Sequence, residues 1–150
     1  MDRTKEILSI LKNSMDYVSG DDIAHKIGVS RTAVWKHINN LGRLGYTITA
    51  LQGKGYRLTG IPDRLYPWEI EHYLNTHCIG KTIIFRETIE STNVLAFTCG
   101  LEGAEEGTCV IAEKQNAGRG RLGRKWFSPI GKNLYISVIL RPHVAPQHVY

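Results

Sequence analysis

Two helix boundaries that lie only two residues apart constrain the fold of this chain most strongly. Gly28 has no Cβ and can end a helix in the left-handed conformation, and Ser30 can cap the next helix. The helix that Gly28 ends has its own start signal at Ser19, with Asp22 in the capping-box position. Such tight spacing forces the two helices to cross steeply. The sequence therefore predicts a helix-turn-helix, preceded by an amphipathic helix over residues 3–14.

The helix after Ser30 has one apolar stripe and one polar face. Val34, Ile38 and Leu41 form the stripe that we expect to be buried, and the opposite face is rich in hydrogen-bond donors and free of acids. A short β-hairpin follows over residues 46–58, with two glycines in its turn and a basic tip. Together these features predict a winged helix-turn-helix domain over residues 1–62.

A winged helix-turn-helix places its third helix in the DNA major groove and its wing on the phosphate backbone. The charge of residues 1–62 suits such a binder, because they hold nine Lys and Arg against five Asp and Glu. The alternative is a small protein-interaction module with a solvated basic face. The predicted DNA-binding residues are Ser30, Arg31, Thr32, Trp35, Lys36, Asn39, Lys54 and Arg57.

Residues 60–63 break the pattern and predict a linker to a second domain over residues 63–150. In that domain Pro67 can open a short helix, and Ser91 or Thr92 can cap a longer one. Apolar runs predict strands over residues 82–85, 109–112 and 134–140. Strands with an intervening helix indicate a mixed α/β domain, so we expect the whole chain to be α+β.

Cysteine usage and hydropathy exclude several classes. The three cysteines (Cys78, Cys99 and Cys109) are odd in number and include no Cys-x-x-Cys pair, so we expect no disulfide framework and no metal ligands among them. Cys99 and Cys109 lie in apolar segments and are expected in the core. No apolar run approaches the roughly 18 to 20 residues that span a bilayer. We therefore expect a cytoplasmic protein without a membrane partner.

A segment rich in glycine and arginine, residues 118–126, is the most informative part of the second domain. Residues 114–125 carry five basic groups and no acid. Glycine permits close backbone approach, and arginine offers planar donors that suit phosphate and carboxylate. We expect this loop not to hold its shape unaided and to be ordered by an anion. The alternative is a disordered basic loop that binds nucleic acid nonspecifically.

This segment, GRGRLGRKW, resembles the GRGRxGRxW loop of biotin-protein ligases. Ser91, Thr92 and Asn93, together with Gln115, are similar to the positions that contact biotin in that family. With the winged helix, the whole chain resembles the N-terminal half of the bifunctional biotin operon repressors and biotin-protein ligases. The fold that the resemblance implies is a winged helix-turn-helix followed by a truncated mixed α/β catalytic domain.

The resemblance implies a two-step activity. Enzymes of this family join biotin to ATP with release of pyrophosphate, and then transfer biotin from biotinyl-5′-AMP to a lysine of the biotin carboxyl carrier protein. The implied ligands are biotin, ATP and Mg²⁺, with the groups that bind the metal expected outside these residues. The implied partners are operator DNA, the carrier protein and, once ligand is bound, a second copy of the chain.

The resemblance also implies roles for individual residues. Arg119 and Arg121 would be catalytic, because they would hold the carboxylate and phosphate charge. Gly118 and Trp126 would lie beside the adenylate. The implied biotin-binding residues are Ser91, Thr92, Asn93, Gln115, Arg119, Gly120 and Arg121.

One departure from the family pattern limits the expected activity. The family's catalytic lysine lies in a KWPN-type motif downstream of the basic loop, and Lys132, the only later lysine here, does not match that motif. We therefore expect these 150 residues alone to have little or no ligase activity. Two other functions stay open. One is a winged-helix regulator with only a remnant of a biotin-sensing domain, and the other is a lipoate ligase, which the loop pattern and the winged helix disfavour.

Overall fold

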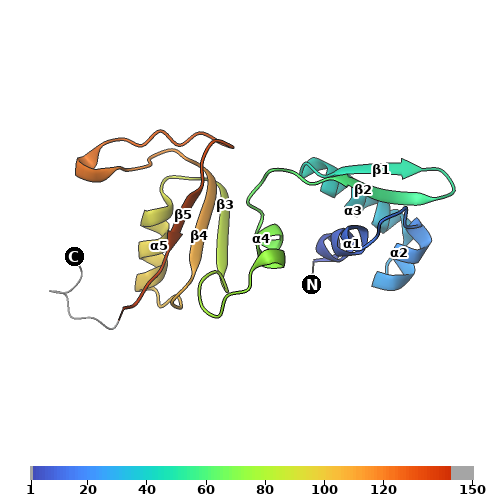
Figure 1. The fold of residues 1–150 in the computed structure, drawn as a ribbon, viewed down its shortest axis with the longest axis horizontal. Helices are drawn as coiled ribbons and strands as arrows, with labels where there is room; N and C mark the ends of the chain where they lie inside the picture. The colour runs from blue at the N-terminus through green and yellow to red at the C-terminus, as the bar shows by residue number, and fades with distance from the viewer. Residues whose placement is uncertain (1, 143–150) are drawn as a thin grey trace. The chain divides into compact units, whose positions relative to one another are not determined.

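The computed structural model describes residues 2–142 (Figure 1). The chain divides into two compact units, Met1–Asp63 and Arg64–Tyr150. The first is a group of helices with a β-hairpin, and the second places helices on a mixed sheet. This combination confirms the predicted α+β class. Within the described residues, no helix has the length and apolar character needed to cross a membrane.

The first unit has the predicted order of elements. Its helix over residues 3–14 ends two residues early, at Lys12. The next apolar residue, Met15, is 97% exposed, so another turn would have buried nothing. The elements are α1 (Arg3–Lys12), α2 (Gly20–Ile27), α3 (Arg31–Arg43), β1 (Thr47–Leu51) and β2 (Gly55–Gly60).

The helix boundaries follow the predicted capping residues. Ser19 Oγ accepts a hydrogen bond from the backbone N–H of Asp22 over 3.0 Å. Ser30 Oγ accepts one from the N–H of Ala33 over 3.2 Å. Gly28 ends α2 in the left-handed conformation, with φ +68°. These contacts confirm the helix-turn-helix that the spacing predicts.

The apolar stripe of α3 is buried as predicted, against α1 and α2. His37 on the same helix is half-buried, and its Nδ1 lies 3.0 Å from Thr4 Oγ1 of α1, so this histidine has a structural role. The core of the unit contains Ile7, Leu8, Leu11, Ile23, Ile27, Val34, Ile38 and Leu41.

The hairpin pairs antiparallel and is held against the start of α2. Val18 and Tyr56 exchange two backbone hydrogen bonds, each of 2.8 Å. Gly55 lies against this pair with φ +110°, and a Cβ at this position would lie 2.0 Å from the carbonyl oxygen of Val18. β2 runs to Gly60, so the predicted linker over residues 60–63 begins one residue later than expected.

The second unit contains α4 (Pro67–Tyr73), β3 (Ile83–Ile89), α5 (Thr92–Leu101), β4 (Cys109–Gln115), the 3₁₀ helix η1 (Arg121–Gly123) and β5 (Tyr135–Val138). The sheet order is β3-β4-β5, with β3 parallel and β5 antiparallel to the central strand. In Figure 1, α5 lies across one face of this sheet. Its Ala96 packs with Val110 and Ile139 in the core. Pro67 opens α4 as predicted.

The strand ends differ from those that apolar patterning predicts. β3 and β4 continue past residues 85 and 112, because Thr88 pairs with Lys114 and Ile89 pairs with Gln115 through the backbone. β5 is shorter than the predicted run over residues 134–140. Backbone pairing includes polar residues as readily as apolar ones, so an apolar run marks the middle of a strand better than its end.

An ion-paired arginine, not anticipated from the sequence, fixes the start of the second unit on the sheet. Arg64 Nη1 lies 3.5 Å from Glu113 Oε2, and Nη2 lies 2.9 Å from Glu87 Oε1. Glu113 is buried, and its Oε1 also accepts a hydrogen bond of 2.8 Å from the N–H of Leu65. Burial lowers the pKa of Arg64, but the attraction of Glu113, Tyr66 and Glu87 outweighs it and the net pKa is raised. The charged pair thus holds the segment before α4 against β4.

Thiol reactivity tests the packing of β4. Burial raises the pKa of the Cys109 thiol, although a hydrogen bond with the backbone of Gly80 opposes this in part. Cys78 is exposed. Because the thiolate is the reactive form, and a raised pKa lowers its fraction at a given pH, we expect Cys78 to be alkylated in the folded chain and Cys109 only after unfolding. Peptide mass mapping after a short pulse of iodoacetamide measures both, and rapid labelling of Cys109 would contradict the packing.

Candidate functional site

The first unit presents a donor-rich surface on α3. Lys54 lies in the turn between β1 and β2, and Arg57 lies on β2; both are exposed. One acid is close to this surface, because Arg31 Nη1 lies 3.5 Å from Asp21 Oδ2. Both side chains are more than two-thirds exposed, so the pair contributes little to stability. The predicted residues on and beside α3 are also exposed: Ser30, Arg31, Thr32, Trp35, Lys36 and Asn39.

In the second unit a cavity of about 480 Å³ forms where α5, the end of β4, the basic loop and β5 meet. Six of the residues singled out from the sequence line it: Ser91, Thr92, Asn93, Gln115, Arg119 and Trp126. Its remaining lining comes from residues 133–137, of which residues 134–137 belong to a predicted strand and none was a predicted site residue. A small hydroxyl in an otherwise apolar run, at Ser137, was the available signal.

The start of α5 is held by the end of β4. Ser91 is the N-cap residue, but its side chain makes no capping hydrogen bond. Instead, Gln115 Oε1 accepts hydrogen bonds from the N–H and the Oγ1 of Thr92, over 2.8 Å and 3.1 Å. A side chain 23 positions away therefore takes the place of the usual local cap. This contact joins the two predicted biotin segments directly.

The basic loop is a small hydrogen-bonded hairpin. Trp126 N donates to Gly118 O over 2.8 Å, and Gly120 N donates to Arg124 O over 2.7 Å. At the tip, Leu122 has φ +58°, which a side chain rarely adopts. We expected this loop not to hold its shape without an anion. The two backbone hydrogen bonds are a source of order within the loop itself, and the sequence did not indicate them.

Gly118 is the tightest point of this hairpin. It is buried, and a Cβ here would lie 2.7 Å from Ser128 Oγ and 2.8 Å from the carbonyl oxygen of Trp126. Its φ lies outside the left-handed region, so close packing rather than backbone angle requires glycine. The loop can return beside β4 only because this residue has no side chain.

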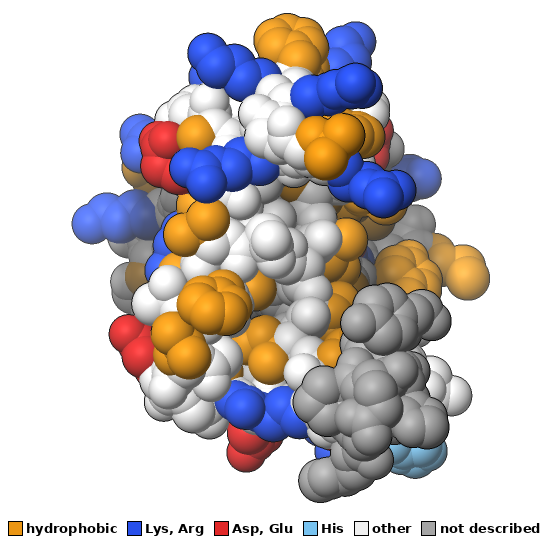
Figure 2. All heavy atoms as spheres, turned by 90° about the vertical axis from the view of Figure 1, so that its left-hand side faces the viewer, with side chains coloured by type: hydrophobic (Ala, Val, Ile, Leu, Met, Phe, Trp, Pro, Cys, Tyr) orange, Lys and Arg blue, Asp and Glu red, His pale blue; other side chains and the backbone are white. Residues whose placement is uncertain are grey.

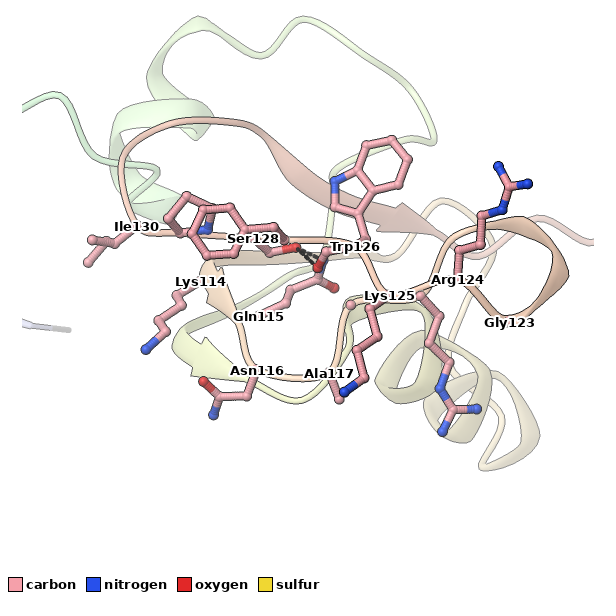
Figure 3. A pocket seen from close by; sticks show the side chains of 14 residues that line it. Lys114, Gln115, Asn116, Ala117, Gly123, Arg124, Lys125, Trp126, Ser128 and Ile130 are labelled. Carbon is pink, nitrogen blue, oxygen red and sulfur yellow. Dashed lines mark hydrogen bonds between the residues drawn. The ribbon is translucent and has the colours of Figure 1, made fainter.

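A second, larger cavity of about 1050 Å³ lies beside the first and shares Gln115, Arg119 and Trp126 with it. Figure 3 shows Lys114 and Lys125 of its lining extending away from the indole of Trp126. Figure 2, which views the molecule from the left-hand side of Figure 1, shows Lys and Arg side chains gathered at the upper end of the face that it presents. The cationic lining of the second cavity consists of Lys114, Arg119, Arg124 and Lys125.

Two predicted residues are separated from the others. Gly120 and Arg121 line neither of these two cavities, whereas Gly118 lines the larger one. Arg121 begins η1 at the exposed tip of the loop. The resemblance implies biotin contacts for both Arg119 and Arg121, but only Arg119 lines the smaller cavity, because the 3₁₀ turn begins at Arg121.

Comparison with known families agrees with both halves of the sequence analysis. Residues 3–57 match the model of an HTH domain, and residues 85–149 match the biotin/lipoate A/B protein ligase family. These matches confirm the predicted order of an N-terminal helix-turn-helix followed by a ligase-type domain.

Individual relatives give the same picture. The chain is 40% identical over 144 residues to the bifunctional ligase/repressor BirA of Bacillus spizizenii, covering 95% of this chain and 44% of the relative. It is 36% identical over 141 residues to that of Escherichia coli, covering 94% and 42%. The solved biotin protein ligase from Aquifex aeolicus, in complex with biotin and ATP, is 38% identical with a TM-score of 0.34, over 40% of this chain and 24% of that one. The chain thus spans less than half the length of its curated relatives and is homologous to them over nearly all of its own.

Proposed function

We propose that this chain is the biotin-binding and DNA-binding part of a bifunctional biotin-protein ligase and biotin-responsive repressor. The observation that carries the proposal is the convergence of Ser91, Thr92, Gln115 and Arg119 on one cavity. The match of residues 85–149 to the ligase family supports it. The whole protein would join biotin to ATP and then transfer biotin to a lysine of the biotin carboxyl carrier protein.

The smaller cavity suits biotin in size and chemistry. Its volume of about 480 Å³ lies within the range of small-molecule sites. The side chains of Ser91, Asn93 and Gln115 offer hydrogen bonds to the ureido group, whose burial would otherwise leave polar atoms unsatisfied. Arg119 offers a planar cation to the carboxylate, and Ile136 contributes apolar wall.

The larger cavity suits a polyanion, and we assign ATP to it. ATP supplies the adenylyl group that activates the biotin carboxylate. Arg119 lines both cavities, so its charge would lie between the carboxylate and the phosphates and offset their repulsion. Gly118 and Trp126 would border the adenylate, and Gly120 and Arg121 would act from the loop tip. These positions align the reactants and exclude water from them.

Mg²⁺ accompanies ATP in this proposal, but the described residues do not provide a site for it. Residues 2–142 contain no group of three or more His, Cys, Asp or Glu side chains that could hold a metal ion. The phosphates of ATP would themselves bind the ion.

The DNA-binding half of the proposal rests on α3 and the wing. Exposed Arg31 and Lys36 on α3 would reach phosphates or guanine edges, and Lys54 and Arg57 would position the wing. Biotinyl-5′-AMP would promote formation of a homodimer, which binds a two-part operator. Ligand binding and assembly would then be linked to repression by mass action.

Titration calorimetry with the 150-residue chain tests the proposal. We expect saturable binding of biotin and none of lipoate. Binding to DNA from upstream of the biotin-synthesis genes should exceed binding to an unrelated duplex. DNA binding without biotin binding would favour a regulator whose second domain is only a remnant, and lipoate binding would favour a lipoate ligase.

Arg31→Ala should separate the two halves of the proposed function. Loss of one base or phosphate contact is expected to weaken binding to the upstream duplex by about 5- to 100-fold, while biotin binding stays unchanged. The ion pair with Asp21 is too exposed for its loss to unfold the unit. Fluorescence anisotropy with labelled DNA measures the first effect and calorimetry the second. Equal loss of both activities would argue against separate roles.

A further inference from the structure

Gln115 stands in a chain of hydrogen bonds that joins four segments of the second unit. Ser137 Oγ donates to Thr92 Oγ1 over 2.9 Å, and Thr92 Oγ1 donates to Gln115 Oε1 over 3.1 Å. Gln115 Nε2 then donates to Ser128 Oγ over 3.3 Å, and Ser128 Oγ donates to the carbonyl oxygen of Trp126 over 3.2 Å. Every donor points the same way, from β5 through α5 and β4 to the basic loop, an arrangement in which each bond strengthens the next.

The orientation of the Gln115 amide follows from this chain. The backbone N–H of Thr92 lies 2.8 Å from the amide and can only donate, so the amide atom beside it has to be the oxygen. The nitrogen therefore faces Ser128, which takes one of its two N–H groups. Among residues 2–142, no hydrogen bond uses the second N–H. Because Gln115 lines the smaller cavity, the group that it can offer to a ligand there is a donor.

Ser128 has no direct place in that cavity. Ser128 lines the larger cavity but not the smaller one, and the residue is only 3% exposed. Its backbone carbonyl accepts a hydrogen bond of 3.1 Å from Gln115 N, so the two residues are joined through backbone and side chain together. Its hydroxyl also fills the space above Gly118, where a Cβ would come within 2.7 Å. Figure 3 shows Ser128 beside Gln115 on the return from the loop.

We propose that Ser128 is a positioning residue that holds one N–H of Gln115 and thereby aims the other at a hydrogen-bond acceptor of the ligand. The identity of that ligand as biotin rests on the proposed function, whereas the orientation of Gln115 does not. A carbonyl or carboxylate oxygen satisfies this N–H. A ligand that places a hydrogen-bond donor at this point would face the N–H of Gln115, and both donors would stay unpaired. Such a mismatch lets a polar site reject the wrong ligand.

Four variants test the proposal. Ser128→Ala removes the hydroxyl and Ser128→Thr keeps it, while Thr98→Ala removes an exposed hydroxyl of α5 outside the chain as the matched control. Gln115→Glu keeps an acceptor for Thr92 but replaces the amide donor with a carboxylate oxygen. All are made in the full 150-residue chain, with the folded state checked by the backbone NMR spectrum.

The first readout is the side-chain amide signal of Gln115 in the ligand-free chain. In Ser128→Ala one of the two Nε2 protons should move upfield and exchange faster, and in Ser128→Thr and Thr98→Ala it should not. The second readout is biotin affinity. A lost neutral hydrogen bond predicts binding about two- to tenfold weaker for Ser128→Ala. A donor turned into an acceptor predicts a loss of at least roughly tenfold for Gln115→Glu.

The two readouts separate this proposal from the proposed function. If the unaltered chain does not bind biotin, the proposed function fails, and the amide signals still decide whether Ser128 orients Gln115. Unchanged Gln115 signals in Ser128→Ala would overturn the positioning role. Biotin binding by Gln115→Glu at full strength would overturn the assignment of a donor to this point of the cavity.

Discussion

Arg119→Ala is expected to weaken biotin binding by about 10- to 100-fold, because a charge-assisted hydrogen bond to a carboxylate contributes about 1.5–3 kcal/mol. Arg119 is the one arginine of the loop that lines the smaller cavity, and it lines the larger one as well. Its side chain is exposed and has no described acid as a partner, so its removal should leave the free energy of unfolding nearly unchanged. Calorimetric titration with biotin measures the effect.

The matched control is Arg86→Ala, an exposed arginine on β3 that lines neither cavity. We expect this variant to bind biotin as the unaltered chain does. The biotin affinity of Arg121→Ala should lie between those of Arg119→Ala and Arg86→Ala, because Arg121 lies at the loop tip. Equal losses for Arg119→Ala and Arg86→Ala would mean that net charge, rather than a contact in the cavity, governs binding.

Gly55→Ala is expected to destabilise the first unit by at least about 3 kcal/mol and to abolish DNA binding. The added Cβ would lie 2.0 Å from the carbonyl oxygen of Val18 and 2.6 Å from Ser19 Cα, and these main-chain atoms cannot rotate away as the end of a side chain could. The φ of +110° adds strain of its own. Relief would require breaking the two hydrogen bonds between Val18 and Tyr56 that hold the wing. Calorimetric unfolding and anisotropy with labelled DNA measure the two effects.

Gly53→Ala separates the clash from the backbone strain. Gly53 lies in the same turn with φ +78°, but a Cβ there meets no atom within 4 Å. Only the cost of the left-handed conformation applies, about 1 kcal/mol. Similar losses of stability in both variants would contradict the close contact between the wing and residues 18 and 19.

The elements that local signals specify were predicted well from the sequence. Ser19, Gly28 and Ser30 act on residues within one helical turn of themselves, so their neighbours in the sequence suffice to place α2 and α3. The hairpin is similarly local. The ends of β3 and β4 depend instead on which residues of a distant strand supply backbone partners, and apolar patterning stops before Lys114 and Gln115.

In the candidate site, too, the residues of a local motif were predicted and the contacts between distant segments were not. The motif identified Ser91, Thr92, Asn93, Gln115, Arg119 and Trp126, and the fold brings these six to one cavity. The supporting contacts were missed. The hydroxyl of Ser137 stands out in an apolar run, but neither it nor Ser128 has a sequence signal that identifies its partner, Thr92 or Gln115, in a distant segment. The Arg64–Glu113 pair was missed for the same reason, since its partners lie 49 positions apart in the numbering.

An NMR titration of the ¹⁵N-labelled chain with biotin tests the central claim, a biotin site at the junction of α5, β4 and the basic loop, most directly. We predict saturable shifts of the backbone signals of Ser91, Thr92, Asn93, Gln115 and Arg119 at one common dissociation constant, with the signals of α1, α2 and α3 unmoved. Lipoate should produce no such shifts. Saturable shifts that leave these five residues unchanged, or no shifts at all, would contradict the claim.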